Sequence, residues 1–265
     1  LSQFSGIELD DFAHEVARLS LYIAEHQMNV EMEEALADVH PRLLPLREAG
    51  NIVCGNALRI DWETVLNAEA DDEVYIFGNP PYIGSKKMTL EQKKELENVV
   101  CSEISSKKLD YISGWFYKAT HLIYGKNAQY AFVTTNSINQ GEQVSILWSV
   151  LLRYGQISFA YQSFKWNNSA AHNAGVTVTI IGFSNKNDKK RIIYSDKGES
   201  YGKNINPYLA FADDIIVSNH NDSEKLNNFP KIVFGNMPRS KYIILTNDDK
   251  NKLVQRYPET EVHFK

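Results

Sequence analysis

The spacing of apolar residues in the first third of the chain predicts strands that alternate with helices. Short apolar runs typical of buried strands lie at 4–9, 52–54 and 74–77. Between the first two, Phe12, Val16, Leu19 and Ile23 recur at helical spacing within a predicted helix over 12–29 that the preceding aspartates can cap. Strands separated by helices in this way favour a parallel sheet of the α/β class.

The same alternation continues to about residue 185 and then changes. Helices are predicted at 111–124 and 143–152, and strands at 129–134, 157–164 and 176–183. We therefore expect a doubly wound, Rossmann-like sheet over 1–185. Beyond a polar linker at 186–190, short strand-like pieces and a helix suggest the start of a smaller α+β module over 186–265. The predicted pieces are strands at 192–194, 215–217, 231–234 and 242–245 and a helix at 247–257.

Composition indicates a soluble globular protein. Of the 265 residues, 43% are hydrophobic and 23% are charged, and no stretch of about 20 apolar residues occurs. The start carries no signal-peptide pattern, and Cys54 and Cys101 lack a metal-ligand spacing, so we expect reduced thiols and a cytoplasmic location. Because the chain begins at Leu1, directly before a strand-like run, we expect a fragment of a longer polypeptide.

Charge is distributed unevenly along the chain. Residues 1–80 contain 4 basic and 16 acidic residues, whereas residues 81–265 contain 24 and 17, so a net charge of −12 is followed by one of +7. A basic second part favours nucleic acid as a partner. Two differently solvated surfaces would explain the same asymmetry equally well.

The tetrapeptide Asn79-Pro80-Pro81-Tyr82 follows the predicted strand at 74–77 directly. It therefore lies at the carboxyl end of a strand, where open α/β sheets bind ligands. An amino group conjugated to a ring or a carbonyl is a poor nucleophile, and two acceptors aimed at its hydrogens return electron density to nitrogen. The Asn79 side chain and the fixed Pro80 carbonyl can supply these acceptors, and Tyr82 can stack on a planar substrate. The alternative is a rigid turn that only ends the strand.

Two other strand ends carry polar residues suited to an adenosine-containing cofactor. Glu8 can accept both ribose hydroxyls, and Asn56, followed by Ala57, can reach the adenine amine. Leu9 can pack on the adenine face. An ordinary strand-end acid, a turn asparagine and a core leucine remain open as alternatives.

These motifs resemble those of the amino-group DNA methyltransferases that use S-adenosylmethionine, in particular the adenine-N6 enzymes of the gamma class. The nearest likeness is to the combined restriction–modification polypeptides of type IIG and, within these, to the MmeI-like (type IIL) group. It covers roughly residues 3–185. The segments that carry it are 6–10, 55–58, 78–84, 109–111, 132–144, 164–168 and 178–183.

The resemblance implies transfer of a methyl group from S-adenosylmethionine to the N6 amine of an adenine flipped out of double-stranded DNA. It makes Asn79, Pro80, Pro81 and Tyr82 the catalytic motif and gives Glu8, Leu9, Asn56 and Ala57 to the cofactor. Asp110 would line the cofactor pocket, and no metal is implied. Phe164 and Trp166 are candidates to hold the flipped base opposite Tyr82, and residues 186–265 would lead into a target-recognition domain.

The sequence departs from the family pattern at its start. The glycine-rich first motif, which binds the methionine part of the cofactor, and the first strand, which is central in the family's sheet, are both absent. Cofactor binding by this piece alone is therefore expected to be weak or lost. The acid-x-Lys spacing of Glu91-Gln92-Lys93 falls on a predicted charged helix and does not make a convincing nuclease site.

Two other functions fit part of the pattern. A protein glutamine-N5 methyltransferase faces the same unreactive nitrogen and uses the same tetrapeptide, but usually ends soon after its last sheet strand, whereas this chain continues for about 80 residues. A catalytically silent DNA-binding fragment would explain the absent glycine-rich motif.

Overall fold

The structure is a computed structural model that divides into two compact units, Leu1–Asn219 and His220–Lys265. It describes residues 1–36, 50–66, 68–69, 71–101, 103–165, 177–185, 190–217 and 246–263. Within these ranges, no helix is long and apolar enough to cross a membrane. In the second unit, the described residues 246–263 form the helix α6 (Asn247–Arg256), capped by Thr246 and followed by a 3-10 segment at Pro258–His263.

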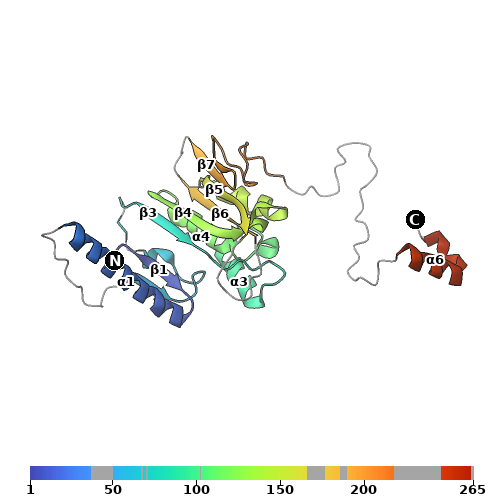
Figure 1. Cartoon of the computed structure of the whole chain (residues 1–265), viewed down its shortest axis with the longest axis horizontal. Coiled ribbons are helices and arrows are strands. Elements are labelled where there is room, and N and C mark those ends of the chain that lie inside the picture. The colour runs from blue at the N-terminus through green and yellow to red at the C-terminus, as the bar shows by residue number, and fades with distance from the viewer. Residues whose placement is uncertain are drawn as a thin grey trace. The chain divides into compact units, whose positions relative to one another are not determined.

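Strands and helices alternate through most of the first unit (Figure 1). The strands are β1 (Ser5–Glu8), β2 (Asn51–Cys54), β3 (Val74–Gly78), β4 (Ala128–Thr135), β5 (Gln156–Lys165), β6 (Thr177–Ser184), β7 (Arg191–Ser195) and β8 (Gly198–Gly202). The α-helices are α1 (Asp11–Ala35), α2 (Trp62–Val65), α3 (Leu90–Val99), α4 (Ser113–Ile123) and the short α5 (Ser149–Leu151), which continues a π-helical turn at Val144–Trp148.

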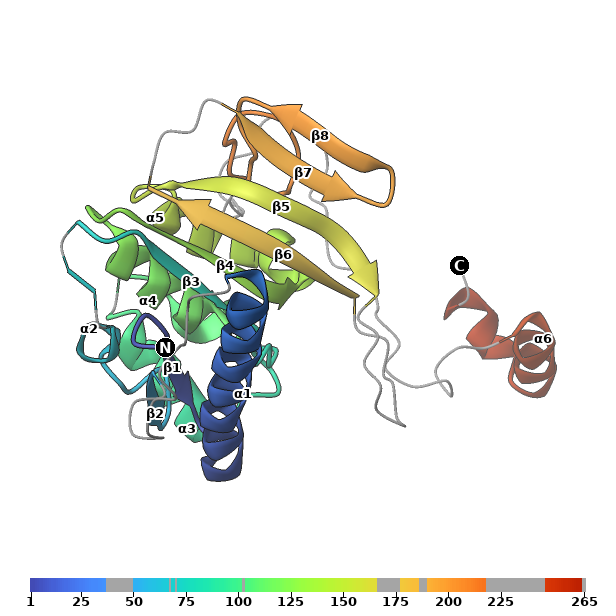
Figure 2. The same cartoon turned by 60° about the vertical axis from the view of Figure 1, so that its left-hand side comes forward.

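Among the described residues, six strands form the main sheet, in the order β3-β4-β6-β5-β7-β8 (Figure 2). β3 is parallel to β4, and β6 is antiparallel to both of its neighbours. It follows that β3, β4 and β5 run in the same direction and that their carboxyl ends meet at one edge. The predicted Rossmann-like α/β class is confirmed. Asn79 lies at this carboxyl edge, where open α/β sheets generally bind ligands.

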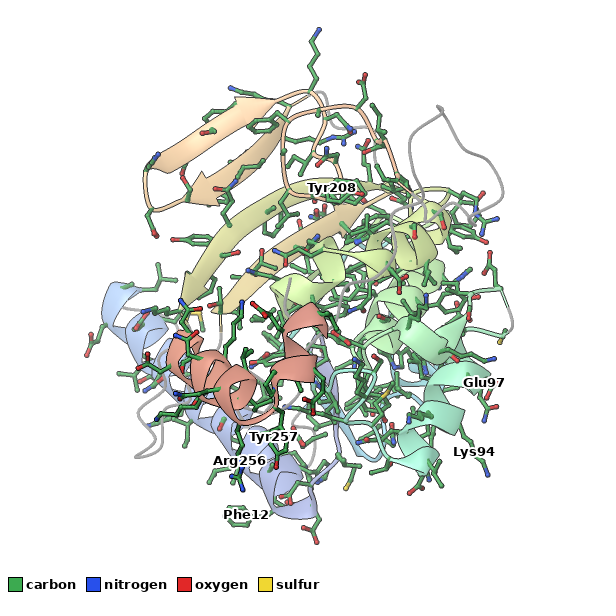
Figure 3. The ribbon with its side chains drawn as sticks, turned by 90° about the vertical axis from the view of Figure 1, so that its right-hand side faces the viewer. Phe12, Lys94, Glu97, Tyr208, Arg256 and Tyr257 are labelled. Carbon is green, nitrogen blue, oxygen red and sulfur yellow. The ribbon has the colours of Figure 1, made fainter. Side chains whose placement is uncertain are left out.

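A separate two-stranded sheet pairs β1 with β2 in parallel. Among the described residues, β1 has no strand partner on its other side, and β3 has none beyond β4. The apolar stripe of α1 is correspondingly uncovered, since Phe12 is 76% and Leu19 56% exposed, and Figure 3 shows Phe12 projecting outward from this helix.

The core lies beneath β4 and β6, where α4 packs. The alternation of buried and partly buried residues along β4 places Tyr130 and Phe132 on the inner face. There the Phe116 ring from α4 makes edge-to-face contacts with both of them and with Trp148, at centroid distances of 5.4 to 6.1 Å. Such aromatic packing fixes α4, and with it the residues that precede this helix, against the sheet.

The first compact unit continues past residue 185, where the change in composition suggested a boundary. β7 pairs in parallel with β5, and β8 pairs with β7, so both extend the main sheet. β8 escaped prediction because its sequence, Gly-Glu-Ser-Tyr-Gly, has no apolar run. The segment at 215–217 forms no strand, and the predicted strands at 231–234 and 242–245 lie outside the described residues.

His121 on α4 packs between two aromatic rings, and from its surroundings we expect the stability of the fold to depend on pH. The His121 ring lies 4.3 Å from that of Tyr117 and 4.5 Å from that of Tyr154. Burial lowers the pKa of His121, and attraction to Glu103 offsets this only in part, while repulsion from Arg153 adds to it. Because the unfolded chain binds the proton more readily, stability should fall as the pH drops from about 7.5 to 5.5.

Replacing His121 by phenylalanine should therefore flatten the melting temperature across this pH range. The hydrogen bond from Tyr117 to Glu103 holds the pKa of that carboxylate below its usual value, so Glu103 stays ionised throughout the window. Thermal unfolding of both proteins, followed by circular dichroism in matched buffers, measures the slope. An unchanged slope in the His121→Phe protein would assign the effect to other groups.

Candidate functional site

The carboxyl edge of the main sheet brings together three segments that are far apart in the sequence. Asn79 follows β3, Asn136 follows β4, and Phe164 is the penultimate residue of β5. The Ser163 hydroxyl donates to Oδ1 of Asn136 at 2.8 Å and so ties the ends of β4 and β5 together. A ligand bound at this edge could contact residues from the ends of all three strands.

The tetrapeptide at this edge combines an exposed carboxamide with a buried proline and a partly buried tyrosine. Asn79 is exposed, and within the described part of the chain its carboxamide makes no hydrogen bond. Pro80 is buried, and its carbonyl accepts no hydrogen bond from any described residue. Pro81 is exposed, whereas Tyr82 is partly buried against the hydrophobic core. Within the described part of the chain, two acceptors without a donor are thus followed closely in sequence by an aromatic ring that packs against the core.

Asp110 holds the loop that follows the tetrapeptide. Its side chain is only 7% exposed; Oδ1 accepts from the Ser85 backbone N–H at 3.0 Å, and Oδ2 accepts from the Ser137 hydroxyl at 2.5 Å. The next residue reinforces this contact, because the Tyr111 N–H donates to the Ile83 carbonyl at 2.9 Å. Asp110 thus joins the loop after the tetrapeptide to the segment after β4. Its predicted place in the cofactor pocket stays a prediction.

The residues predicted to bind adenosine lie at or just after the ends of β1 and β2, which are paired. Oε1 of Glu8 accepts from the backbone N–H groups of Leu9 and Asp10, at 2.8 and 3.2 Å. Oε2 of Glu8 makes no hydrogen bond with the described residues. The Leu9 side chain is 69% exposed, so it is not a core residue in the described part of the chain. The arrangement leaves a carboxylate oxygen and an apolar side chain open at the ends of these strands.

The loop after β2 is held by two charged side chains that sequence reasoning missed. Asn56 accepts from the Leu58 N–H at 2.9 Å, the turn-type contact that had remained an alternative, and donates to Glu95 of α3 at 3.1 Å. Lys118 of α4 donates to the Ala57 carbonyl at 2.9 Å and also to that of Ile60. Partial burial lowers the pKa of Lys118. Neither residue belongs to a motif, so only the folded chain brings them to this loop.

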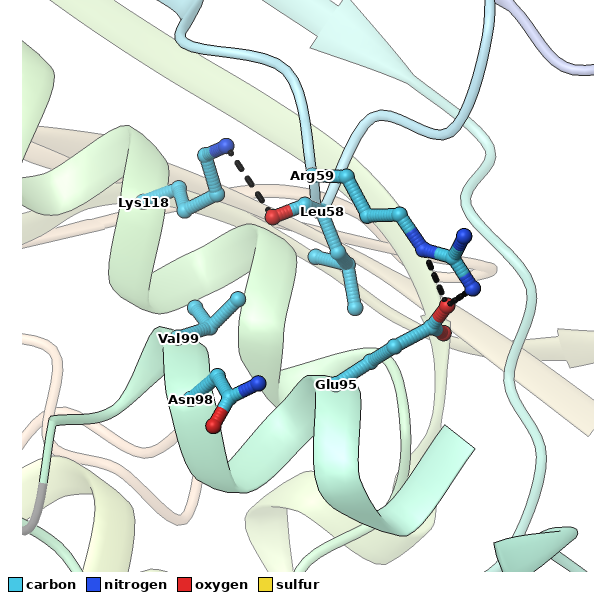
Figure 4. Close-up of a pocket in the computed structure, with 6 residues that line it drawn as sticks. All are labelled: Leu58, Arg59, Glu95, Asn98, Val99 and Lys118. Carbon is cyan, nitrogen blue, oxygen red and sulfur yellow. Dashed lines mark hydrogen bonds and ion pairs between the residues drawn. The ribbon is translucent and has the colours of Figure 1, made fainter. Parts of the chain in front are cut away.

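Beside this loop, an open pocket of about 460 Å³ lies between α3 and α4 (Figure 4). Its lining residues are Leu58, Arg59, Glu95, Asn98, Val99 and Lys118. None of the tetrapeptide residues lines it, and Phe164 does not either. It therefore borders the predicted adenine-binding loop and is separate from the expected position of the target base.

The aromatic residue at the end of β5 is placed by an irregularity in strand pairing. Register with β6 shifts between Tyr161 and Phe164. In a regular strand these two side chains would point to opposite faces, yet their rings meet edge to face with centroids 5.1 Å apart. Phe164 thus stands partly exposed near the carboxyl edge. Trp166, the second candidate for stacking on the base, lies outside the described residues.

The described residues contain no group of three or more histidine, cysteine or acidic side chains that could hold a metal ion. Glu91, the acid of the acid-x-Lys spacing, lies on α3 and is paired with Arg59. Both cysteines are free and exposed.

Comparisons with known proteins agree with this geometry. The family model described as the DNA-methyltransferase domain of MmeI matches residues 1–195. A Bacillus subtilis (strain 168) protein named DNA methyltransferase A is 45% identical over 268 residues, covering 100% of this chain and 30% of its own length. A solved structure of the type IIL restriction-modification enzyme MmeI in complex with DNA shares 37% identity with a TM-score of 0.82, covering 98% of this chain and 35% of that one.

The chain thus spans about a third of the length of these relatives. The family match includes the two-stranded sheet, the tetrapeptide and the strands up to β7. The resemblance inferred from the motifs is confirmed at the level of the family. Since the match extends over well more than half of the residues, the chain belongs to the family of MmeI-type DNA-methyltransferase domains.

Proposed function

We propose that this chain is the catalytic part of a site-specific DNA methyltransferase that transfers a methyl group from S-adenosylmethionine to the N6 amine of adenine, within a restriction–modification protein. The observation that carries the proposal is that the Asn79 carboxamide and the Pro80 carbonyl, at the carboxyl edge of the sheet, have no hydrogen-bond partner among the described residues. Two similar proteins, named as a DNA methyltransferase and as a restriction-modification enzyme, support the substrate class.

The chemistry asked of the tetrapeptide is activation of an unreactive amine. In adenine the N6 lone pair is delocalised into the ring, so the amine needs help to act as a nucleophile. The Asn79 Oδ1 and the Pro80 carbonyl each accept one N6 hydrogen, which localises the lone pair on nitrogen. Because Pro80 is buried and fixed in φ, its acceptor is held in place before the substrate arrives.

The residues around β1 and β2 fit an adenosine-containing cofactor. The open oxygen of Glu8 can accept ribose hydroxyls, and Asn56 Oδ1 retains one lone pair for an adenine amine. The Ala57 N–H, which has no hydrogen bond among the described residues, suits the neighbouring ring nitrogen. S-adenosylmethionine would supply an electrophilic methyl group. The residues around β1 and β2 would then bind the nucleoside part of this cofactor, and the tetrapeptide would orient the N6 amine of the target adenine.

The target base would lie between aromatic side chains. A base inside a duplex cannot reach the carboxyl edge of the sheet, so adenine must leave the stack at a cost of a few kcal/mol. Stacking on Tyr82, with Phe164 opposite, offsets part of this cost at about 1–3 kcal/mol per base. Trp166 remains a second candidate for the opposite face. The net positive charge of residues 81–265 favours DNA as the partner.

Replacing Tyr82 by alanine should weaken capture of the flipped base without removing DNA binding. In the intact protein, a duplex with 2-aminopurine at the target position reports flipping as a rise in fluorescence. We expect this rise to shrink strongly in the Tyr82→Ala protein, because the flipped state loses about 1–3 kcal/mol of stacking. Tyr124→Ala provides a control, since Tyr124 is 60% exposed after α4 and away from the edge. A full fluorescence rise in the Tyr82 variant would refute the stacking role.

A further inference from the structure

Glu95 is an acid that turns inward from a charged helix. Its neighbours Lys94 and Glu97 project into solvent from α3 (Figure 3), whereas Glu95 is only 9% exposed. Its carboxylate accepts from Nδ2 of Asn56 at 3.1 Å, from Nε of Arg59 at 2.7 Å and from the Tyr111 hydroxyl. Figure 4 shows the contact with Arg59. A buried carboxylate with three donors is fully engaged in one arrangement.

These donors keep Glu95 ionised. Burial alone would raise its pKa, but the hydrogen bonds from Tyr111, Arg59 and Asn56, with the attraction of the guanidinium, together lower the pKa below its usual value. Hydrogen bonding to Glu95 correspondingly raises the pKa of Tyr111, as burial does, so the phenol keeps its proton and donates. At neutral pH the carboxylate is therefore an acceptor only.

An acceptor-only partner fixes which way a carboxamide points. An asparagine side chain has a donor end and an acceptor end of nearly equal size, and either can face a neighbour that both donates and accepts. Glu95 admits only the amino group of Asn56 on its side. Oδ1 of Asn56 must then face the loop, where it accepts from the Leu58 N–H at 2.9 Å and keeps a second lone pair.

We propose that Glu95 is a positioning residue that sets the orientation of Asn56 and thereby makes the cofactor site specific for adenine over a 6-oxopurine. The inference rests on the proposed function, in which the loop at 55–58 holds the cofactor base. Adenine presents an amine at its 6-position and satisfies Oδ1 of Asn56. Hypoxanthine presents a carbonyl there, which the same oxygen repels.

The test compares two cofactor products that differ only at this position. Dissociation constants of S-adenosylhomocysteine and S-inosylhomocysteine are measured by calorimetry on the intact protein that contains this domain. The native protein should prefer the adenosyl compound by at least about tenfold, because a site built around a hydrogen bond rejects a ligand that leaves it unpaired. Glu95→Gln keeps the shape but removes the acceptor-only partner, so that only the Leu58 N–H still opposes a flipped Asn56, and the preference should fall several-fold. Glu91→Gln, which removes an exposed contact of Arg59 alone, should keep it.

The possible results separate the inference from the function on which it rests. A lower preference in Glu95→Gln but not in Glu91→Gln supports the positioning role. An unchanged preference, or equal weakening of both ligands, overturns it, since a merely structural role would weaken both alike. Asn56→Ala should also lose the preference, and a retained preference there overturns the inference even if Glu95→Gln does not fold. If the native protein binds neither compound, the cofactor assignment itself fails.

Discussion

Replacing Asn79 by alanine is expected to lower the turnover number for DNA methylation by at least about 10²–10³-fold while leaving DNA affinity nearly unchanged. Removing one pre-aligned group that stabilises developing charge has an effect of this size in other enzymes. Asn79 is exposed and makes no hydrogen bond with the described residues, so its loss should not disturb the fold. The measurement is single-turnover transfer of labelled methyl to duplex DNA by the intact protein, with binding followed separately.

Asn127→Ala provides the matched control, because Asn127 is an exposed asparagine before β4 and outside the proposed site. It should retain native turnover. An Asn79→Ala protein that loses DNA binding but keeps its turnover would refute the assigned role. So would equal effects of the two substitutions.

Replacing Asp110 by alanine should be nearly as damaging, although both of its carboxylate oxygens already accept hydrogen bonds from this chain. Its two oxygens accept from the Ser85 N–H and the Ser137 hydroxyl, and they hold the loop after the tetrapeptide to the segment after β4. Misplacing reacting groups by about 1 Å can cost about 10²-fold in rate. We therefore expect turnover to fall by about 10²-fold, with a small change in the KM for S-adenosylmethionine.

Ser137→Ala is the graded control, since it removes one of the two contacts and should give an intermediate loss. The pattern distinguishes positioning from cofactor binding. If Asp110→Ala raised the KM for S-adenosylmethionine strongly and left turnover intact, Asp110 would belong to the cofactor pocket, as the family resemblance implies. A loss that only follows a lowered melting temperature would instead point to the fold.

Most of the fold could be predicted from local patterns, because the formation of a strand or helix depends mainly on residues that are close together in the sequence. The apolar runs before Glu8 and Asn79 became β1 and β3, and the tetrapeptide came to lie at the carboxyl edge that its place after a strand implied. The helix predicted from residue 12 also formed. Its apolar stripe is nevertheless exposed in this structure. Hydrophobic spacing predicts which face of a helix is apolar, but it does not predict which other segment packs against that face.

Tertiary contacts account for what the sequence could not show. In the sequence, Glu95 is one of several charged residues of a Lys- and Glu-rich helix. It becomes a buried hydrogen-bond acceptor for Asn56 only because α3 packs beside the loop after β2. Lys118 is likewise an ordinary helical lysine until it reaches the carbonyl of Ala57. The edge-to-face contact of Phe164 depends on a register shift that no residue pattern marks.

The central claim is that the acceptors at the end of β3 activate an adenine amine, and the position of the transferred methyl group tests it most directly. The intact protein is incubated with methyl-labelled S-adenosylmethionine and duplex DNA, and the DNA is digested to nucleosides and separated. The account predicts label in N6-methyladenine, with none after Asn79→Ala. Label in a methylated cytosine, or on a protein glutamine with none in DNA, would contradict it.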